Sequence, residues 1–469
     1  MNSQPNEPAN AKAPRPTLKK VSRRGYRWLW MGVVLTGVAV LSATAGAFLA
    51  MTMASTPLMQ RKLSAKEAAV FSKGDLSSVN NLQLPELTRP VNILVLGAKV
   101  LTSDLSEADP SQPDRGYHAL VNSFDGLTDT MLLLRFNPET KKVVLLSIPR
   151  DTRVEIPGYG ANKINAANSL GGPALSARTV SELLGGTGID RYVTINVQGV
   201  EALIDALGGV TVTVPKDMKY QDDSQHLYVN LKAGKQHLNG NQALQLLRFR
   251  NDELGDIGRV QRQQMVMRAL SEQALNPATV ARLPKILSVI KSHIDTNLSV
   301  EELVALVGFA TNIDRSNMQM LIVPGEYGDI GTYGTSYWLP NPDRIQALSA
   351  QFFNLGTAST DRANPADLRI SIQDSTRRAT PETVASRLGQ AGYTNTIVTD
   401  PYGEPLTATR IVAQQGDVKS AEAVRSLLGL GEIRVEGTGD LGSDITIQLG
   451  QDWLQRQSAQ PQSNSLSTR

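Results

Sequence analysis

The first pattern along the chain is a long stretch without charge. No charged residue occurs from Trp28 to Gln60, and residues 28–54 are long and apolar enough to cross a bilayer as a helix. Basic residues are enriched on the cytoplasmic side of spanning helices, and five of them precede this stretch: Lys19, Lys20, Arg23, Arg24 and Arg27. We therefore expect a single-pass protein of the plasma membrane, with a cytoplasmic N-terminus and its bulk outside.

A cleaved signal peptide is the alternative interpretation of the same stretch. The apolar region of a signal peptide usually has about 7–15 residues, fewer than this one contains, so its length favours a retained anchor. Around it, residues 1–27 form a basic tail that we expect to be disordered and cytoplasmic, and residues 55–89 are expected to be a stalk or linker. The Gln/Ser-rich residues 453–469 are expected to form a second disordered tail.

Short apolar runs alternate with helical patterns through residues 90–355. The runs predict strands at Val91–Leu96, Thr130–Phe136, Val143–Ile148, Tyr192–Val197 and Val210–Val214. Helices are predicted at Ala174–Leu184, Val200–Ala206, Gly240–Leu247, Gly258–Leu275, Val280–Ser292 and Val300–Ala310, before a Gly/Tyr-rich loop at Gly325–Tyr337. This alternation predicts an α/β fold (an α+β sandwich) with a central mixed sheet flanked by helices.

A second, smaller α+β domain is predicted over residues 366–452. Leu368–Gln373 alternates strictly, Pro381 opens a helix, and a strand pair follows around Ile397 and Ile411. The next helix begins after Asp417 and ends at Gly429, and strands at Ile433–Glu436 and Ile445–Leu449 complete a β-α-β-β-α-β arrangement.

Charge and composition exclude several classes of function. The chain has 47 basic and 44 acidic residues, but seven bases and one acid lie in residues 1–27, which leaves the remainder net acidic. No basic surface for nucleic acid is therefore expected. The absence of cysteine excludes disulfides, thiolate catalysis and Cys-ligated zinc. A G-x-G-x-x-G match at Gly437–Gly442 precedes a predicted strand instead of a helix, so we interpret it as a turn.

Arginines near predicted strand ends are the main chemical signal. Arg150 and Asp151 directly follow a buried strand, where α/β sheets usually present their chemistry. Arg248 and Arg250 are two residues apart, so they would share one side of an extended segment. A guanidinium group can donate two parallel charged hydrogen bonds to phosphate, which suits a pyrophosphate ligand.

Carboxylates close to these arginines indicate a divalent metal. Asp129 begins a predicted strand and is the best candidate ligand for Mg²⁺ or Mn²⁺, which shares phosphate oxygens with its substrate. Asp256, Arg259 and Gln263 follow at helical spacing. Each of these residues alone would be interpreted as a surface group, but together they predict a site for phosphate or pyrophosphate with a metal ion.

These segments resemble the LytR-CpsA-Psr family of cell-wall glycopolymer ligases. The matching residues run in family order: Asn92–Gly97, Thr128–Met131, Ser147–Thr152, Lys163–Ala167, Gly171–Gly172, Asp205–Val210, Gly240–Arg250 and Asp256–Gln264. Residues 366–452 resemble the C-terminal domain that often accompanies this family.

The resemblance implies a magnesium-dependent phosphotransferase. It would move a glycopolymer from a polyprenyl-pyrophosphate carrier to a sugar hydroxyl of peptidoglycan. Its implied catalytic residues are Asp129, Arg150 and Asp256. The pyrophosphate ligands would be Arg150, Arg248, Arg250, Arg259 and Gln263, and Asp129 would bind the metal.

One position departs from the family. The family usually has an aspartate two residues after the glycine that ends the first strand, and this chain has Lys99 there. Either Asp104 or Asp125 could replace that acid, or Lys99 could itself meet phosphate. The general base is likewise open between Asp129, Asp151 and Asp256. A non-catalytic envelope adaptor and a transcriptional attenuator are the alternative functions; the acidic folded part argues against the second.

Overall fold

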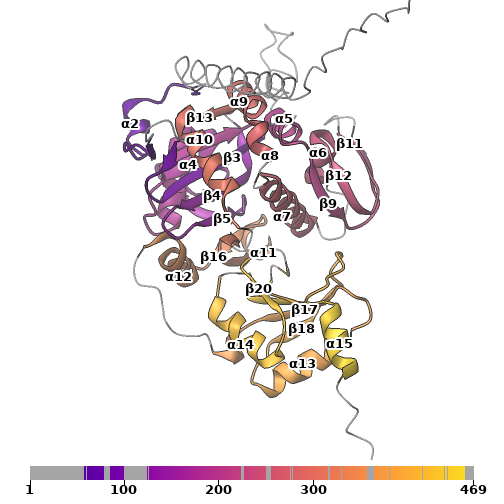
Figure 1. Ribbon diagram of the computed structural model, residues 1–469. Coiled ribbons are helices and arrows are strands. Elements are labelled where there is room, and N and C mark those ends of the chain that lie inside the picture. The colour runs from indigo at the N-terminus through magenta and orange to yellow at the C-terminus, as the bar shows by residue number, and fades with distance from the viewer. Residues whose placement is uncertain are drawn as a thin grey trace, which may run out of the picture. The chain divides into compact units, whose positions relative to one another are not determined.

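Figure 1 shows the computed structural model of the chain. It describes residues 58–459 apart from 60, 79–84, 100–123, 125, 223–226, 250–254, 275, 277, 315–316, 329, 356–363, 380, 415, 438 and 441. Residues 57–469 form one compact unit. The predicted basic tail and membrane segment lie outside the described residues, and among the described ones no helix combines the length and apolar content needed to cross a bilayer.

A six-stranded mixed sheet forms the centre of the larger domain. Its strands, in spatial order, are β13 (Ile294–Thr296), β8 (Arg191–Ile195), β3 (Val91–Lys99), β4 (Leu127–Asn137), β5 (Lys142–Ile148) and β14 (Met318–Ile322). β4 is antiparallel to both β3 and β5, whereas β8 runs parallel to β3 and β14 runs parallel to β5. The predicted mixed α/β architecture is confirmed.

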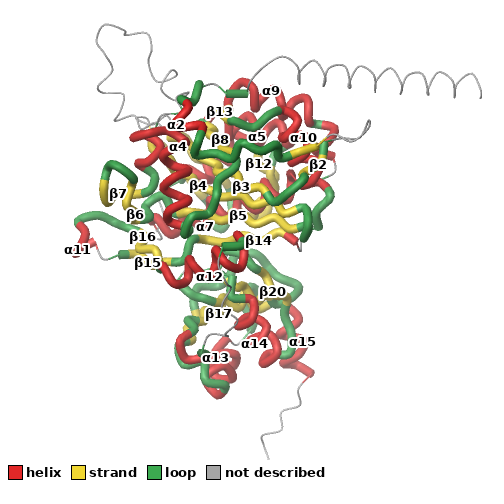
Figure 2. The backbone as a smooth tube through the Cα atoms, turned by 90° about the vertical axis from the view of Figure 1, so that its left-hand side faces the viewer, coloured by secondary structure: helices red, strands yellow, loops and turns green. Residues whose placement is uncertain are grey.

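Helices cover both faces of this sheet (Figures 1 and 2). On one face Leu94, Leu133 and Leu146 pack with helices α4 (Ala166–Leu183) and α12 (Pro342–Phe353). On the other face Ile93 packs with α10 (Val300–Thr311). Side chains alternate between the faces of a strand, so the unbroken apolar run of β5 is explained by burial on both sides.

A helical subdomain extends the larger domain between β8 and β13. It contains α5 (Val197–Leu207), α6 (Gly240–Arg248), α7 (Gly255–Ala274), α8 (Ala278–Ala281) and α9 (Leu283–His293), with the pairs β9–β12 (Val210–Val214, Gly234–Leu238) and β10–β11 (Met218–Asp222, Leu227–Leu231). The bounds predicted for the strand at Val210–Val214 are confirmed, but this strand pairs with β12 outside the main sheet. The strand predicted to reach Val197 ends at Ile195, because Asn196 caps α5 by accepting a hydrogen bond from Gly199 N.

The segment expected to be a stalk is part of the folded domain. It contains α2 (Ala65–Ala68), β1 (Ser77–Ser78) and β2 (Glu86–Leu87). Phe71 lies in the main core with its ring centroid 5.2 Å from that of Tyr192, and Leu76 is fully buried. The expectation of a free stalk was wrong for these residues. Burying their large apolar side chains in the folded domain is favourable, whereas a free linker would leave those side chains exposed to water.

The smaller domain has a five-stranded sheet in the order β18-β17-β21-β19-β20. Its elements along the chain are β17 (Ile370–Asp374), α13 (Pro381–Gln390), β18 (Thr396–Val398), β19 (Arg410–Ala413), α14 (Val418–Leu428), β20 (Glu432–Arg434), β21 (Ile445–Leu449) and α15 (Gln451–Ala459). The last strand, β21, takes the centre of the sheet, parallel to β17 and antiparallel to β19.

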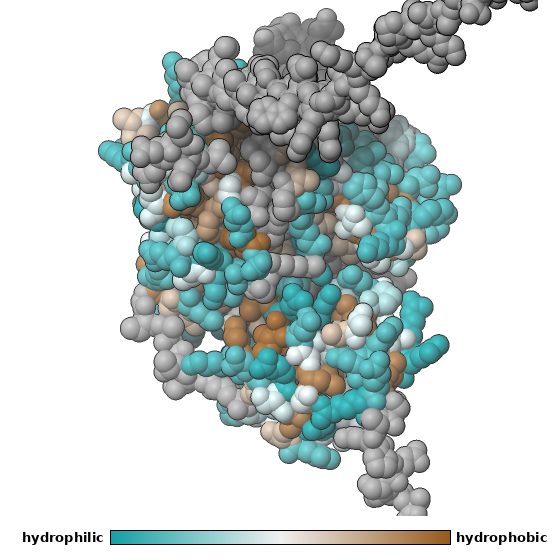
Figure 3. Space-filling model, in the orientation of Figure 1, coloured by the Kyte–Doolittle hydropathy of each residue, from teal (hydrophilic) through white to brown (hydrophobic). Residues whose placement is uncertain are grey.

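Two expectations for the smaller domain have different outcomes. Asp417 caps α14, and Gly429 ends it with a left-handed φ of 72°, as predicted. By contrast, α15 extends to Ala459, so the first residues of the expected C-terminal tail are helical, and Trp453 is buried in the core. Hydrophilic side chains cover most of the described surface visible in Figure 3.

Candidate functional site

A fixed loop presents Arg150 at the end of β5. Thr152 N donates to Pro149 O at 3.0 Å, which closes a tight turn around Arg150. The backbone of this turn is also bonded to the segment before α4: Asn165 N donates to Arg150 O at 3.2 Å and Ile164 N donates to Thr152 O at 2.8 Å. These bonds hold the arginine at a strand end with little backbone freedom, as the sequence predicted.

Asp129 lies at an irregularity in the neighbouring strand. Gly97 of β3 pairs with Thr130 and Ala98 pairs with Thr128, so Asp129 is the extra residue of a β-bulge in β4. A Cβ atom on Gly97 would lie only 3.1 Å from Thr130 Cβ, so glycine allows the two strands to approach here. Bulges of this kind redirect side chains near functional sites.

Arg150 joins two carboxylates. Its Nη1 atom donates to Asp129 Oδ1 at 2.6 Å, and its Nε atom donates to Asp151 Oδ2 at 3.3 Å. Lys163, at the end of β7 (Gly160–Lys163), donates from Nζ to Asp151 Oδ1 at 2.9 Å. The four side chains are 14–28% exposed, so the chain of alternating charges remains open to a solvent-borne ligand.

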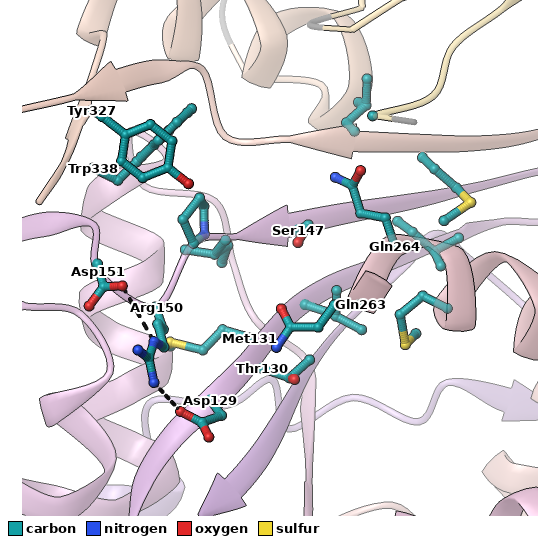
Figure 4. A pocket seen from close by; sticks show the side chains of 18 residues that line it. Asp129, Thr130, Met131, Ser147, Arg150, Asp151, Gln263, Gln264, Tyr327 and Trp338 are labelled. Carbon is teal, nitrogen blue, oxygen red and sulfur yellow. Dashed lines mark hydrogen bonds and ion pairs between the residues drawn. The ribbon is translucent and has the colours of Figure 1, made fainter. Parts of the chain in front are cut away.

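A pocket that is partly open to solvent extends from these charges between the sheet and α7. Its walls are mainly apolar and include Met131, Leu132, Leu145, Met267 and Met320. In Figure 4, Asp129, Arg150 and Asp151 lie at one end, Gln264 of α7 lies toward the other, and Gln263 of α7 lies between them. A ligand with a charged head and an apolar tail would match this division.

The Gly/Tyr-rich loop borders the charged end of the pocket. It contains β15 (Gly325–Tyr327) and α11 (Ile330–Tyr333), and β16 (Trp338–Pro340) follows it and pairs with β15. Trp338 N donates to Asp151 O at 3.0 Å, and the Tyr327 ring packs edge-on against Trp338 with centroids 5.1 Å apart. Both aromatic side chains line the pocket (Figure 4).

Four of the predicted candidates line this pocket: Asp129, Arg150, Gln263 and Asp151, which is a candidate for the general base. Arg248 does not occupy the predicted extended segment, because α6 continues to this residue and the extended conformation begins at Phe249. The prediction that Arg248 and Arg250 share one side of an extended segment is therefore wrong for Arg248, because its side chain projects from a helix. Arg248 is not among the described residues that line the pocket.

The remaining candidates are not described in enough detail to place their side chains. Asp256 and Arg259 are in α7, but only the course of their backbone is described. Lys99 ends β3 with the same restriction. Arg250, Asp104 and Asp125 lie outside the described residues.

Sequence reasoning missed several groups at this site. Lys163 lies in a segment that resembles the family, but the resemblance implies no role for it. Tyr327 lies within the Gly/Tyr-rich loop and Trp338 directly follows it, and the composition of this loop does not indicate that either residue reaches the site. Gln264 follows the predicted Gln263 and also lines the pocket. A lysine twelve residues after Asp151 gives no local signal of contact, because the β6–β7 hairpin (Arg153–Ile156, Gly160–Lys163) brings the two together.

The donor set is compatible with a magnesium ion. Mg²⁺ usually takes one or two protein carboxylates and completes its shell with water and phosphate oxygens. Asp129 and Asp151, on either side of Arg150, supply such a pair. Within the described part of the chain no group of three or more His, Asp or Glu side chains gathers. A metal held here would therefore depend on oxygens from the substrate.

Known families match most of the chain. A model of the LytR_cpsA_psr family matches residues 55–354. A second model, described as the LytR cell envelope-related transcriptional attenuator, matches residues 367–453.

Individual proteins are also similar to this chain. The regulatory protein MsrR of Staphylococcus aureus (strain COL) is 36% identical over 210 residues, which are 44% of this chain and 62% of MsrR, so the chain spans about three fifths of that relative. The polyisoprenyl-teichoic acid–peptidoglycan teichoic acid transferase TagU of Oceanobacillus iheyensis is 32% identical over 347 residues, 71% of this chain and 96% of TagU. The crystal structure of B. subtilis TagV aligns with 57% of this chain and 98% of TagV, at 28% identity and a TM-score of 0.47. The chain belongs to the LytR-CpsA-Psr family.

Proposed function

We propose that this protein is a phosphotransferase of cell-wall assembly that moves a glycopolymer, as a glycosyl phosphate, from a polyprenyl-pyrophosphate carrier to a sugar hydroxyl of peptidoglycan. The observation that carries the proposal is the ion-paired Arg150 at one end of a mainly apolar pocket. A polyprenyl pyrophosphate has the same division between charge and hydrocarbon. The name of TagU, a teichoic acid transferase acting on peptidoglycan, supports the same class of reaction.

The chemistry follows from the charges at that end. The pyrophosphate would take guanidinium hydrogen bonds that Arg150 now gives to Asp129 and Asp151. The acceptor hydroxyl attacks the phosphorus that carries the glycan, a new P–O bond forms, and the P–O bond to the carrier breaks to release polyprenyl phosphate. The hydroxyl proton passes to a carboxylate, with Asp129, Asp151 and Asp256 as the candidates.

Positioning and charge neutralisation supply the catalysis, and no covalent enzyme intermediate is needed. A bound Mg²⁺ or Mn²⁺ would neutralise phosphate charge, and Asp129 is the carboxylate that we propose as its ligand. Arg248, Arg250, Arg259 and Gln263 are proposed to complete the pyrophosphate site. The proposed setting is the outer face of the plasma membrane, where the anchor at residues 28–54 would hold the enzyme beside its lipid-linked substrate.

The test is direct turnover. The full-length protein in detergent is given a polyprenyl-pyrophosphate-linked glycan and a peptidoglycan fragment, and mass spectrometry follows both the sugar-phosphate adduct and free polyprenyl phosphate. We expect the two products to appear in equal amounts. An adaptor would retain the lipid without releasing polyprenyl phosphate. In cells, peptidoglycan prepared with and without this protein should differ in bound sugar phosphate.

A further inference from the structure

The loop between β20 and β21, residues 435–444, leaves the smaller domain and reaches the larger one. Val435 O accepts a hydrogen bond from Met320 N at 2.8 Å, so the loop pairs with β14, the edge strand of the main sheet. Val435 also packs against the main hydrophobic core. The smaller domain therefore contributes a backbone segment next to the strand that forms part of the pocket wall.

Two ion pairs join this loop to the larger domain. Arg268 of α7 lies 4.0 Å from Glu436, with side chains only 16% and 12% exposed. Burial by itself would lower the pKa of Arg268, but Glu436, Tyr402 and Glu272 raise it overall, so the guanidinium stays charged. At the other end of the loop, Arg344 Nη1 donates to Asp444 Oδ1 at 2.5 Å. The Arg268–Glu436 pair is shielded from solvent, whereas the Arg344 side chain is 40% exposed; together the two pairs define the position of the loop on α7 and α12.

Gly437 brings the loop into the pocket wall itself. A Cβ atom added at Gly437 would lie 2.7 Å from Gln264 Nε2, which shows how closely the loop backbone approaches this side chain. Gln264 is itself buried, and its Oε1 atom has no hydrogen-bond partner among the described residues. In Figure 4, Gln264 lies at the end of the pocket away from Arg150.

We infer that the smaller domain closes the far end of the apolar pocket, and that Gly437 against Gln264 sets the length of hydrocarbon chain that the pocket accepts. This inference rests on the proposed function, because it assigns the charged end to pyrophosphate and the apolar walls to the prenyl chain. Glycine at 437 leaves the Gln264 side chain in place. A larger residue at 437 would either displace the Gln264 side chain into the space for the prenyl chain or occupy that space with its own side chain. The first glycine of the G-x-G-x-x-G match thus has a role unrelated to nucleotides.

The experiment compares Gly437→Leu with the wild type, using geranyl pyrophosphate as the short ligand and undecaprenyl pyrophosphate as the long one. Binding to the full-length protein is followed by the change in tryptophan fluorescence, since Trp338 lines the pocket. We expect the variant to lose about tenfold or more in affinity for the long ligand, because excluding as few as two CH₂ groups has that effect. Affinity for the short ligand should stay within about twofold.

Gly442→Leu is the matched control. Gly442 lies in the same loop, is exposed, and has only Asp440 Oδ1 near its Cβ direction, at 3.4 Å. This variant should bind both ligands as the wild type does. If Gly437→Leu proves unstable in a melting curve, Gly437→Ala replaces it, because its Cβ meets only the far end of the Gln264 side chain. The alanine variant should show a smaller loss with the same dependence on ligand length.

The outcomes separate this inference from the proposed function. If Gly437 variants bind both ligands like the wild type, or lose both equally, the loop does not set chain length and the inference is overturned. If the wild type binds neither prenyl pyrophosphate, the proposed function fails, and the inference fails with it. A loss confined to the long ligand in the Gly437 variants supports the inference.

Discussion

At the scale of single residues, Arg150 carries the most weight because, among the described residues, it is the cation that lines the charged end of the pocket. Its planar guanidinium spans two carboxylates 2.6 Å and 3.3 Å away, a geometry that an ammonium group cannot reproduce. We expect Arg150→Lys to lower kcat/KM by roughly tenfold to a hundredfold, because one charge-assisted hydrogen bond contributes about 1.5–3 kcal/mol. Steady-state kinetics on the lipid-linked glycan measure this change.

Arg178→Lys is the control for this substitution. Arg178 pairs with Glu182 on the surface of α4, and its side chain is 61% exposed. It should keep full activity, and both lysine variants should melt close to the wild type, since partly exposed ion pairs contribute little to stability. A fully active Arg150→Lys enzyme would remove Arg150 from the pyrophosphate site.

Asp129 gives the prediction for the metal. Asp129→Asn keeps the shape of the side chain but removes the charge that a divalent ion needs, so turnover should fall sharply while lipid binding persists. The same loss should follow when a chelator is added to the wild type, and excess Mg²⁺ or Mn²⁺ should reverse it. Asp217→Asn is a matched control, because Asp217 pairs with Lys232 on the exposed surface. Undiminished turnover in Asp129→Asn, or in excess chelator, would show that the metal is held elsewhere or is not required.

Only part of the site could be predicted residue by residue. Arg150 and Asp129 stand at the ends of strands that apolar runs identify, so their proximity follows from sheet geometry. Lys163 and Trp338 reach the site through hairpins with no counterpart in local periodicity. Arg248 was misplaced because the helix propagates one residue further than its apolar pattern. Its role and that of Arg250 in binding pyrophosphate remain predictions.

At the scale of elements, one carboxylate links three segments. Glu302 near the start of α10 accepts from Arg191 Nη2 at 2.6 Å and from Arg191 Nε at 3.1 Å. It also forms the capping box of α10 with Ser299. Arg191 of β8 in turn donates to the carbonyl oxygens of Ser72 and Gly74, in the segment expected to be a stalk. The side chains of Arg191 and Glu302 are 10% and 7% exposed, so this pair is shielded from solvent.

We therefore expect Glu302→Ala to destabilise the larger domain strongly. Removing one partner leaves a buried guanidinium without its counter-ion, which costs about 3–5 kcal/mol. Glu302→Ala also removes the hydrogen bond from Ser299 N to the Glu302 carboxylate, worth about 0.5–1.5 kcal/mol, while the Ser299 side chain still caps the helix. The melting temperature measured by calorimetry should fall by roughly 10 °C. Glu182→Ala, which breaks an exposed pair on α4, should change it by about 1–2 °C. Equal melting temperatures for the two variants would contradict the assigned role of Glu302.

Element types were more predictable than their partners. β21 and β9 have the predicted bounds, because short runs rich in β-branched residues and flanked by turn residues strongly favour strands. The sequence does not indicate that β21 takes the centre of its sheet or that β9 pairs outside the main one, since pairing depends on contacts distant along the chain. The order of strands is a property of the whole fold.

At the scale of the whole molecule, the proposed reaction requires the pocket to lie on the outer side of the membrane. The proposed substrates are a lipid-linked glycan and peptidoglycan, which meet on the outer face of the plasma membrane. The predicted anchor at residues 28–54 follows five basic residues, and the chain beyond them is net acidic. Because positive charge is retained on the cytoplasmic side, this asymmetry predicts that residues 57–469 are exported.

Protease accessibility tests this topology. Protease added to intact spheroplasts should digest the larger and smaller domains, including an epitope at the C-terminus, while an epitope at the N-terminus stays protected until detergent is added. A cytoplasmic marker protein monitors lysis. A signal peptide cleaved after export would separate the N-terminal epitope from the rest, and the exported part would then leave the membrane fraction. A protected C-terminus would place Arg150 and its pocket in the cytoplasm, away from peptidoglycan, and the proposed transfer reaction would have no acceptor.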